Sequence, residues 1–67
     1  MTLGENIRKA RNDRGLSIAI LSIKSGVPYY TIRNWEIGVC FPSVMNLIDV
    51  ADALNISLDE LVGRSRG

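Results

Sequence analysis

The sequence predicts an all-α domain of five short helices, and three observations support this class. Apolar residues recur at spacings of three and four in several segments, as they do along one face of an α-helix, and no segment shows the alternation of a half-buried strand. Capping residues and glycines divide the chain at short intervals. The chain has 67 residues, of which 46% are hydrophobic, so we expect one small domain over residues 1–63 and a flexible tail over residues 64–67.

Local signals place the first helix near the N-terminus. Thr2 and Glu5 match a capping box, in which the Thr hydroxyl accepts a bond from the Glu amide and the Glu side chain reaches back to the Thr amide. Gly15 supplies the left-handed conformation at which helices often end. A helix between these residues presents Leu3, Ile7 and Ala10 on one side.

The second and third helices follow in close succession. Ser17 is a typical cap for a helix over about 18–25, which Gly26 ends. Pro28 opens the third helix, because its fixed φ suits a first turn, and Gly38 closes it.

The last two helices are also bounded by caps. The fourth begins at Ser43 and stops at Asn55. Its apolar positions follow the helical period: Leu47, Ile48, Ala51 and Leu54. Ser57 and Glu60 match a second capping box, which predicts a short fifth helix with Leu61 buried and Val62 either buried or at the surface.

The short turn between the second and third helices predicts a helix-turn-helix. Only about three residues, 26–28, join the two helices, and such a turn sets them at a steep angle. Ser22 provides the small side chain needed where the second helix approaches the third. Val27, Ile32 and Trp35 then point inward together.

Composition excludes several classes of function. There is no histidine and only one cysteine, Cys40, so the sequence predicts no intramolecular disulfide, no structural zinc site, no cofactor and no nucleophile–base pair for an enzyme. We interpret Cys40 as a small hydrophobic residue or a free thiol. No membrane-spanning run or signal peptide is visible, and we expect a cytoplasmic protein.

Net charge alone does not identify a partner. The formal charge is +1, which is too small to indicate a polyanion. The charges are nevertheless unevenly placed: six of eight basic residues precede residue 34, and four of seven acidic residues follow residue 48. A case for nucleic-acid binding therefore depends on where the cations lie.

Four segments resemble the Cro/cI-type, lambda-repressor-like helix-turn-helix proteins of the XRE family. They are IRKARNDRGLS, GVPYYTIRNWEIG, FPSVMNLIDVADALNIS and LDELVG, and the resemblance covers roughly residues 3–63. It implies a compact five-helix lambda-repressor-like domain that binds double-stranded DNA in a sequence-specific manner as a repressor-like transcriptional regulator. It also implies a homodimer, and no small-molecule effector is predicted.

The resemblance assigns DNA contacts to the third helix, about 28–37, which in this family enters the major groove. Arg33 has the donors for guanine O6 and N7, and Asn34 has the groups to pair with adenine. The family also holds phosphates at the starts of the second and fourth helices. The predicted DNA-binding residues are Ser17, Pro28, Tyr29, Tyr30, Thr31, Arg33, Asn34 and Ser43. The alternatives are a solvated helix face for Arg33 and Asn34, and packing against the fold for the tyrosines.

Other charged residues have structural interpretations. Arg11 and Glu36 resemble the internal ion pair of the family, which joins the first helix to the third. Removing one partner of such a pair leaves a poorly compensated charge. Arg8 and Lys9 either touch phosphate or belong to an ordinary solvated face.

The sequence departs from the family in two places that concern phosphate binding. Ile18 occupies the position where the family often has a glutamine, and the loop over residues 37–41 carries no charge. Both changes predict weaker DNA binding with a flatter salt dependence.

The apolar second helix supports an alternative function. On the same fold, the protein is then a protein–protein interaction module with weak or no DNA binding, which uses this helix and the 37–41 loop. Ile20 and Ile23 are the candidate contacts, unless a shifted helix buries them. Leu58 and Val62 are the candidate dimer contacts.

Overall fold

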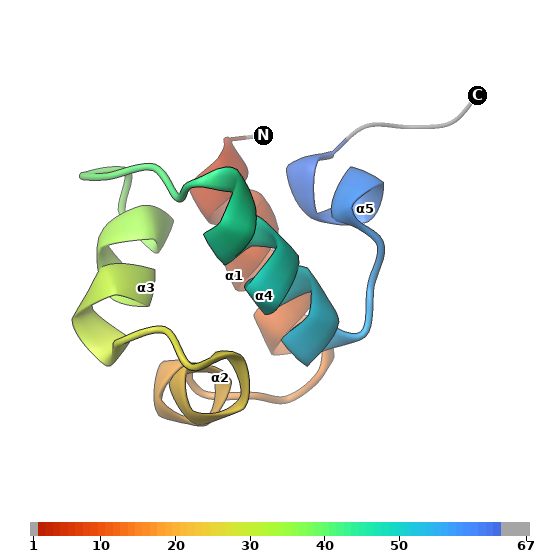
Figure 1. Ribbon diagram of the computed structural model, residues 1–67, viewed down its shortest axis with the longest axis horizontal. Helices are drawn as coiled ribbons and strands as arrows, with labels where there is room; N and C mark the ends of the chain where they lie inside the picture. Colours follow the sequence, from red (N-terminus) through yellow and green to blue (C-terminus); the bar gives the residue numbers. More distant parts are fainter. Residues whose placement is uncertain (1, 64–67) are drawn as a thin grey trace.

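The computed structural model describes residues 2–63, and these residues form five α-helices and no strand (Figure 1). The helices are α1 (Leu3–Asp13), α2 (Ile18–Ser25), α3 (Tyr29–Glu36), α4 (Val44–Leu54) and α5 (Leu58–Val62). The predicted all-α, five-helix class is therefore confirmed. The tail predicted over residues 64–67 lies outside the described residues.

Hydroxyl side chains begin four of the helices, as the sequence predicts. The box at α1 is complete: the Glu5 amide donates to Thr2 Oγ1 at 3.1 Å, and the Thr2 amide donates to Glu5 Oε1 at 2.9 Å. The other three caps each accept from the third residue of their helix at 3.1–3.2 Å; they are Ser17, Ser43 and Ser57. These bonds satisfy amides that have no partner inside the helix.

Two details of the predicted caps are wrong. The second box is only half formed among the described residues, because Ser57 accepts from the Glu60 amide but no bond returns from the Glu60 side chain. That side chain instead lines a small pocket of about 120 Å³ between α1 and α5, beside Lys9 and Arg14. At α3, Pro28 is the cap and not the first helical residue, because its ψ of 145° is extended.

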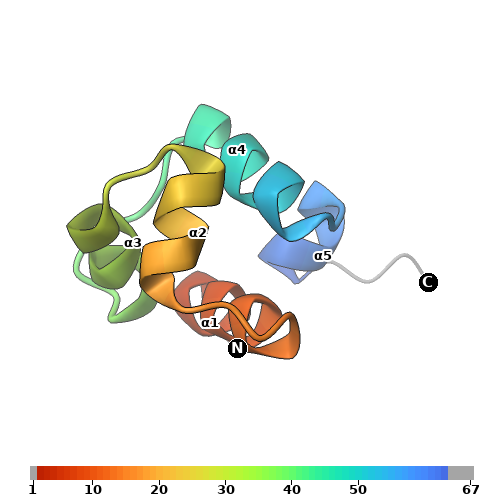
Figure 2. The ribbon, with the colours of Figure 1, turned by 90° about the horizontal axis from the view of Figure 1, so that it is seen from below.

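The helices surround one core. α1 packs on α3 and α5, α2 packs on α3 and α4, and α4 packs on α5. Figure 2 shows α1 and α4 on opposite sides, with α2 and α3 at one end of the molecule and α5 at the other. The buried hydrophobic residues come from all five helices and the α2–α3 turn: Ile7, Leu21, Val27, Ile32, Trp35, Val50, Ala51, Leu54 and Leu61. None of the described helices is long and apolar enough to cross a bilayer.

The register of α4 corrects one predicted position. Val50 is fully buried, whereas Ile48 is 38% exposed. The core face of α4 contains Leu47, Val50, Ala51 and Leu54, which have the i, i+3, i+4, i+7 spacing of a single helical face, and Ala53 packs at its edge. Ile48 lies beside that face and points outward.

Candidate nucleic-acid interface

Side-chain hydrogen bonds hold the turn between α2 and α3. Ser22 Oγ donates to the Val27 carbonyl at 2.5 Å, and the Val27 amide donates to Ser25 Oγ at 3.3 Å. Gly26 makes the reversal at φ +75°, a conformation that costs glycine little. Sequence analysis explained the small side chain at position 22 but did not predict the hydrogen bond that its hydroxyl makes. The presence of Ser in place of Ala at this position could have indicated that bond.

Helix α3 is anchored on one side and open on the other. Ile32 is fully buried and Trp35 is 3% exposed. Arg33 is exposed on the opposite side, and Thr31 and Asn34 are half-buried. In Figure 1, α3 lies at an edge of the molecule, with no other element outside it. The polar side of α3 is thus accessible to a ligand.

The two tyrosines of α3 contact each other. Their ring centroids are 5.4 Å apart with an interplanar angle of 82°, an edge-to-face arrangement. Tyr29 is 42% exposed and Tyr30 is 73% exposed, so Tyr29 is partly shielded while most of the Tyr30 ring meets solvent. The exposed Tyr30 ring therefore lies in the first turn of α3.

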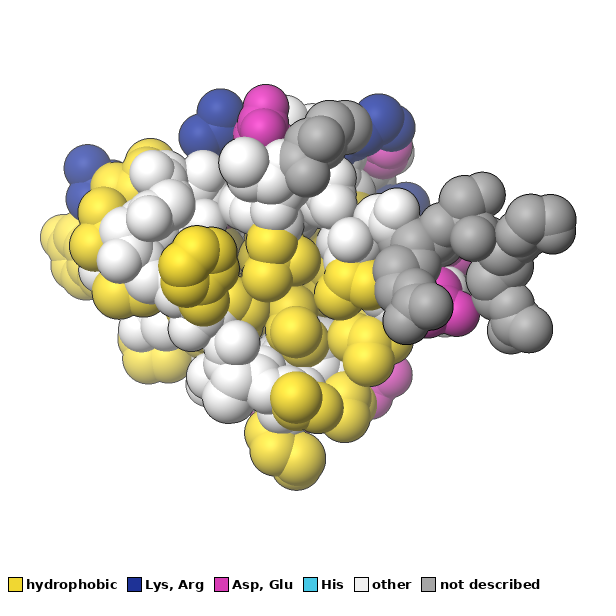
Figure 3. Space-filling model, turned by 90° about the horizontal axis from the view of Figure 1, so that it is seen from above, with side chains coloured by type: hydrophobic (Ala, Val, Ile, Leu, Met, Phe, Trp, Pro, Cys, Tyr) yellow, Lys and Arg dark blue, Asp and Glu magenta, His cyan; other side chains and the backbone are white. Residues whose placement is uncertain are grey.

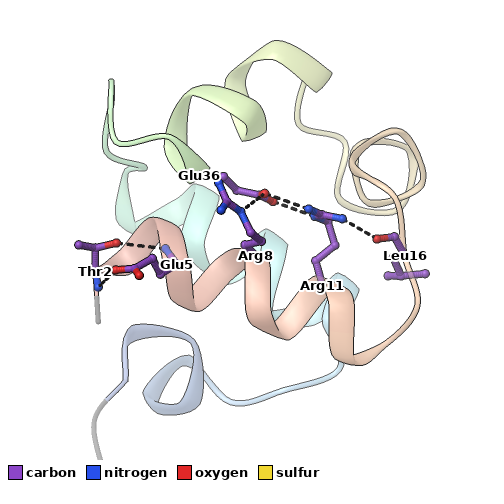
Figure 4. A network of polar contacts seen from close by, with 6 residues as sticks. All are labelled: Thr2, Glu5, Arg8, Arg11, Leu16 and Glu36. Carbon is purple, nitrogen blue, oxygen red and sulfur yellow. Dashed lines mark hydrogen bonds and ion pairs between the residues drawn. The ribbon is translucent and has the colours of Figure 1, made fainter.

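Glu36 joins three parts of the chain (Figure 4). Its carboxylate accepts two bonds from Arg11, with Nε to Oε2 at 2.8 Å and Nη2 to Oε1 at 3.0 Å. The same guanidinium donates from Nη1 to the Leu16 carbonyl at 2.8 Å, just before α2. Arg8 Nε lies 3.5 Å from Oε1. The Arg11–Glu36 ion pair expected from the sequence is therefore present, and the contacts from Arg8 and to Leu16 were not foreseen.

Burial explains why this ion pair matters. The Glu36 side chain is 3% exposed and that of Arg11 is 12% exposed. The hydrogen bonds to Glu36 raise the pKa of Arg11 above its already high ordinary value, so the guanidinium stays charged. The pair fixes the C-terminal end of α3 against α1.

A glycine on α1 allows the same two helices to approach closely. Gly4 is buried, and a Cβ atom built on it would lie 2.8 Å from the Glu36 carbonyl oxygen and still closer to that of Trp35. Both carbonyls belong to the end of α3. No local pattern in the sequence indicates this role, because it depends on two carbonyls more than thirty positions away.

The predicted phosphate contacts lie at helix starts on the surface. Ser17 and Ser43 are both exposed caps, and the first amides of α2 and α4 have no partners within their helices. Ile18, at the position of the expected glutamine, is half-buried and packs against the core. The Ile18 side chain therefore contributes to the core and has no donor for a phosphate.

The loop after α3 is apolar and exposed. Ile37, Val39 and Phe41 are 52%, 66% and 79% exposed, and Cys40 is an exposed free thiol. The Val39 and Cys40 amides donate to the Asn34 carbonyl at 2.9 and 3.4 Å. The loop is therefore bonded directly to the last turn of α3.

The remaining candidates are distributed around the surface. Ile20 is 42% exposed and Ile23 is 78% exposed, so α2 is not shifted to bury them. On α5, Leu58 is 37% exposed and Val62 is half-buried. Lys9 pairs with Asp13 at 2.9 Å on an exposed face of α1.

Comparison with known proteins gives consistent matches. The model of the helix-turn-helix family HTH_3 matches residues 7–61. The cryptic phage CTXphi transcriptional repressor RstR of Vibrio cholerae is 33% identical over 64 residues, which are 96% of this chain and 57% of the relative. The chain thus spans little more than half the length of that curated relative.

Solved structures resemble the whole domain. The restriction-modification controller protein C.AhdI from Aeromonas hydrophila has a TM-score of 0.86 and 32% identity, covering 88% of this chain and 89% of that one. The P22 c2 repressor, solved in complex with a synthetic operator, has a TM-score of 0.87 and 31% identity, covering 97% of this chain and 98% of that one.

Proposed function

The chain belongs to the helix-turn-helix family HTH_3 and has the lambda-repressor-like fold, and from this we propose that it is a sequence-specific regulator that reads the major groove of double-stranded DNA with α3. The family and fold are those of DNA-binding transcription regulators and not of enzymes. The observation that carries the proposal is the uncovered polar side of α3, opposite the buried Ile32 and Trp35. The P22 c2 repressor, a similar structure, was solved with operator DNA, which supports the same ligand for this chain.

Base reading is assigned to residues on the accessible side of α3. Arg33 donates two parallel bonds to guanine O6 and N7, and Asn34 pairs with adenine N6 and N7; each such pair discriminates bases by about 1–3 kcal/mol. Tyr30, with its ring in solvent, has an edge for the thymine methyl and a hydroxyl for phosphate. Pro28, Tyr29 and Thr31 complete the surface that faces the duplex.

Phosphate contacts position the domain. The amides that follow Ser17 and Ser43 point outward from two helix starts, where the helix dipole favours an anion. The uncharged 37–41 loop and Ile18 add no cation, so binding depends on few neutralised phosphates.

A homodimer fits this limited contact. One α3 reads only a few base pairs, and two copies place their recognition helices about 34 Å apart in successive major grooves. Leu58 and Val62 on α5 are the proposed contacts between copies. We expect the protein to act in the cytoplasm, with the DNA it binds, and we propose no small-molecule effector.

The alternative, a protein–protein interaction module with weak or no DNA binding, is not favoured by the comparisons. The similar proteins include a transcriptional repressor and a repressor–operator complex. The exposed Ile20 and Ile23 fit such a module. Scattered exposed hydrophobic residues are, however, common on the surfaces of ordinary proteins.

Selection of binding sites from random duplexes tests the proposal. We expect enrichment of a palindromic sequence, with half-sites about one helical turn apart. Arg33→Ala should weaken binding by about 1–3 kcal/mol and relax preference at one position of each half-site. Lys9→Ala, on the exposed face of α1, is the control and should select the same sequence. Absence of any enriched sequence would contradict the proposal.

A further inference from the structure

Exposed hydrophobic side chains occur over much of this molecule, so exposure alone does not identify a specific contact. Figure 3 shows many of them gathered across the middle of one face, with charged side chains at its rim. Tyr30 is distinguished by its surroundings: its ring is 73% exposed, yet it contacts another aromatic ring, that of Tyr29. The two tyrosines lie in the first turn of α3, the helix to which base reading is assigned.

The contact between the two tyrosines does not follow from helix geometry. Successive side chains of an α-helix point about 100° apart, so neighbours at i and i+1 do not face each other. Contact requires both rings to turn toward each other, and they meet edge to face with their centroids 5.4 Å apart. This arrangement is favourable, because the positive edge of one ring meets the negative face of the other. Among the rotamers of Tyr30, the contact therefore selects the one that keeps the rings together.

Tyr29 is the better held of the two residues. It is 42% exposed, against 73% for Tyr30. The hydrogen bonds to Glu36 are the main cause of the raised pKa of Arg11, and Tyr29 makes a smaller electrostatic contribution in the same direction, which places Tyr29 near that guanidinium. Arg11 is itself fixed by its bonds to Glu36 and to the Leu16 carbonyl. Tyr29 thus lies near this rigid network and also contacts the exposed ring of Tyr30.

From this arrangement we infer that Tyr29 is a positioning residue, whose ring holds the Tyr30 ring in the orientation that reads a thymine methyl. The inference rests on the proposed function, and it gives Tyr29 a role through Tyr30 and not through a base of its own. A mobile surface side chain loses rotamer freedom when it is immobilised at an interface, and this loss opposes binding. A ring that is already held loses less, so more of its contact with the methyl group appears as affinity.

The orientation of Tyr30 can be measured by NMR in the free protein. Three-bond couplings should show one dominant χ1 rotamer for Tyr30 in the wild type and averaging among rotamers in Tyr29→Leu, which keeps an apolar side chain but removes the ring. Tyr29→Phe keeps the ring and should match the wild type. Circular dichroism checks the fold, and Tyr29→Met replaces Tyr29→Leu if the latter is unfolded. Averaged couplings in the wild type, or a single rotamer that persists without the Tyr29 ring, would overturn the inference.

Titrations on the selected duplex test the consequence for DNA binding. Tyr29→Leu should weaken binding about two- to tenfold, and Tyr29→Phe should change it by less than about twofold. In a double-mutant cycle, Tyr29→Leu should add nothing to the effect of Tyr30→Ala, because Tyr29 acts only through Tyr30. Additive losses would show that Tyr29 contacts DNA independently, and the positioning role would then be wrong.

Removal of a single methyl group identifies the base that is read. Deoxyuridine in place of thymidine lacks the C5 methyl and keeps the base pair. At the position that Tyr30 reads, this replacement should weaken wild-type binding about fourfold, and it should have a smaller effect on Tyr29→Leu and almost none on Tyr30→Ala. A wild-type chain that tolerates deoxyuridine at every thymidine of the duplex would contradict the inference.

The positioning role and the proposed function fail in different ways. If no duplex is enriched, DNA reading fails and thymine recognition fails with it, while the couplings of the free protein still decide whether Tyr29 holds Tyr30. If the wild type binds a selected duplex but its Tyr30 couplings are averaged, DNA reading stands and the positioning role fails.

Discussion

Glu36 is the carboxylate on which the placement of α3 depends. It is nearly buried and receives donors from two arginines of α1, one of which also bonds to the Leu16 carbonyl. Isolated surface ion pairs contribute little, because water screens them. A pair with both partners mostly out of water behaves differently, since loss of one partner leaves the other charge without compensation.

Glu36→Gln should therefore lower the free energy of unfolding by about 3 kcal/mol. We expect the low end of the range for a broken buried pair, because Arg8 remains partly in water. Urea denaturation followed by circular dichroism measures this change. The control Lys9→Ala breaks the exposed pair with Asp13 and should cost no more than about 0.5 kcal/mol. If both substitutions had the same small effect, the Glu36 network would be an ordinary surface contact.

Glu5 makes the stability of the domain depend on pH in a definite direction. The Thr2 amide, and after it the Thr2 hydroxyl, lower the pKa of this carboxyl by hydrogen bonding. The folded state thus favours the ionised form. Its contribution is fully present above the pKa of Glu in the unfolded chain, about 4.3, and is lost as the pH falls through the lower folded pKa.

Comparison of the wild type with Glu5→Gln isolates this contribution. The wild type should be the more stable at pH 7, and the difference in urea midpoint should shrink as the pH falls below about 4. Gln retains an acceptor for the cap but does not titrate in this range. A difference that stays constant from pH 7 to pH 3 would show that the carboxylate charge has no role at the cap.

At the level of the helices, most boundaries could be predicted from the sequence because caps are local. Ser17, Ser43 and Ser57 each act on an amide three residues away, and Gly26 needs only its own φ. The register of α4 could also be predicted from the sequence. With Ser43 as the cap, the helical face that contains Leu47 includes Val50 and excludes Ile48. That error came from counting adjacent apolar residues as one face.

Contacts between helices were less accessible to sequence reasoning. The bond from Ser22 to Val27 and the approach of Gly4 to the end of α3 depend on how whole helices are oriented. The open side of α3 was predictable, because Ile32 and Trp35 define the buried side. Which base each side chain contacts depends on the DNA and not on the chain alone.

Gly4→Ala tests the close approach of α1 to α3. Alanine has the higher helix propensity, by about 1 kcal/mol, so an unobstructed site would be stabilised. Here the added Cβ meets two backbone carbonyls, and overpacking of this kind costs about 1–3 kcal/mol. We expect a lower Tm and displaced amide resonances for Trp35 and Glu36. Asn12→Ala, at an exposed position of α1, should not lower the Tm and should leave those resonances in place; a more stable Gly4→Ala variant would contradict the observed approach.

At the scale of the whole molecule, affinity for DNA should respond to salt less than in a protein with a basic loop. Each neutralised phosphate contributes about 0.9 to the slope of log K against log salt. The 37–41 loop directly follows α3 and lies beside it, yet it carries no charge (Figure 1). A cation placed there tests whether the loop borders the duplex.

Cys40→Lys is suited to this test, because the Cys40 side chain is exposed and makes no disulfide. If the loop borders phosphate, the slope should steepen by about 0.9 for each half-site, and affinity at low salt should rise. Asn12→Lys adds the same charge at an exposed position of α1 and should leave the slope nearly unchanged. Titrations at several salt concentrations on the selected duplex give both slopes. Equal slopes for the two variants would place the loop away from the phosphates and require a different orientation of α3 on DNA.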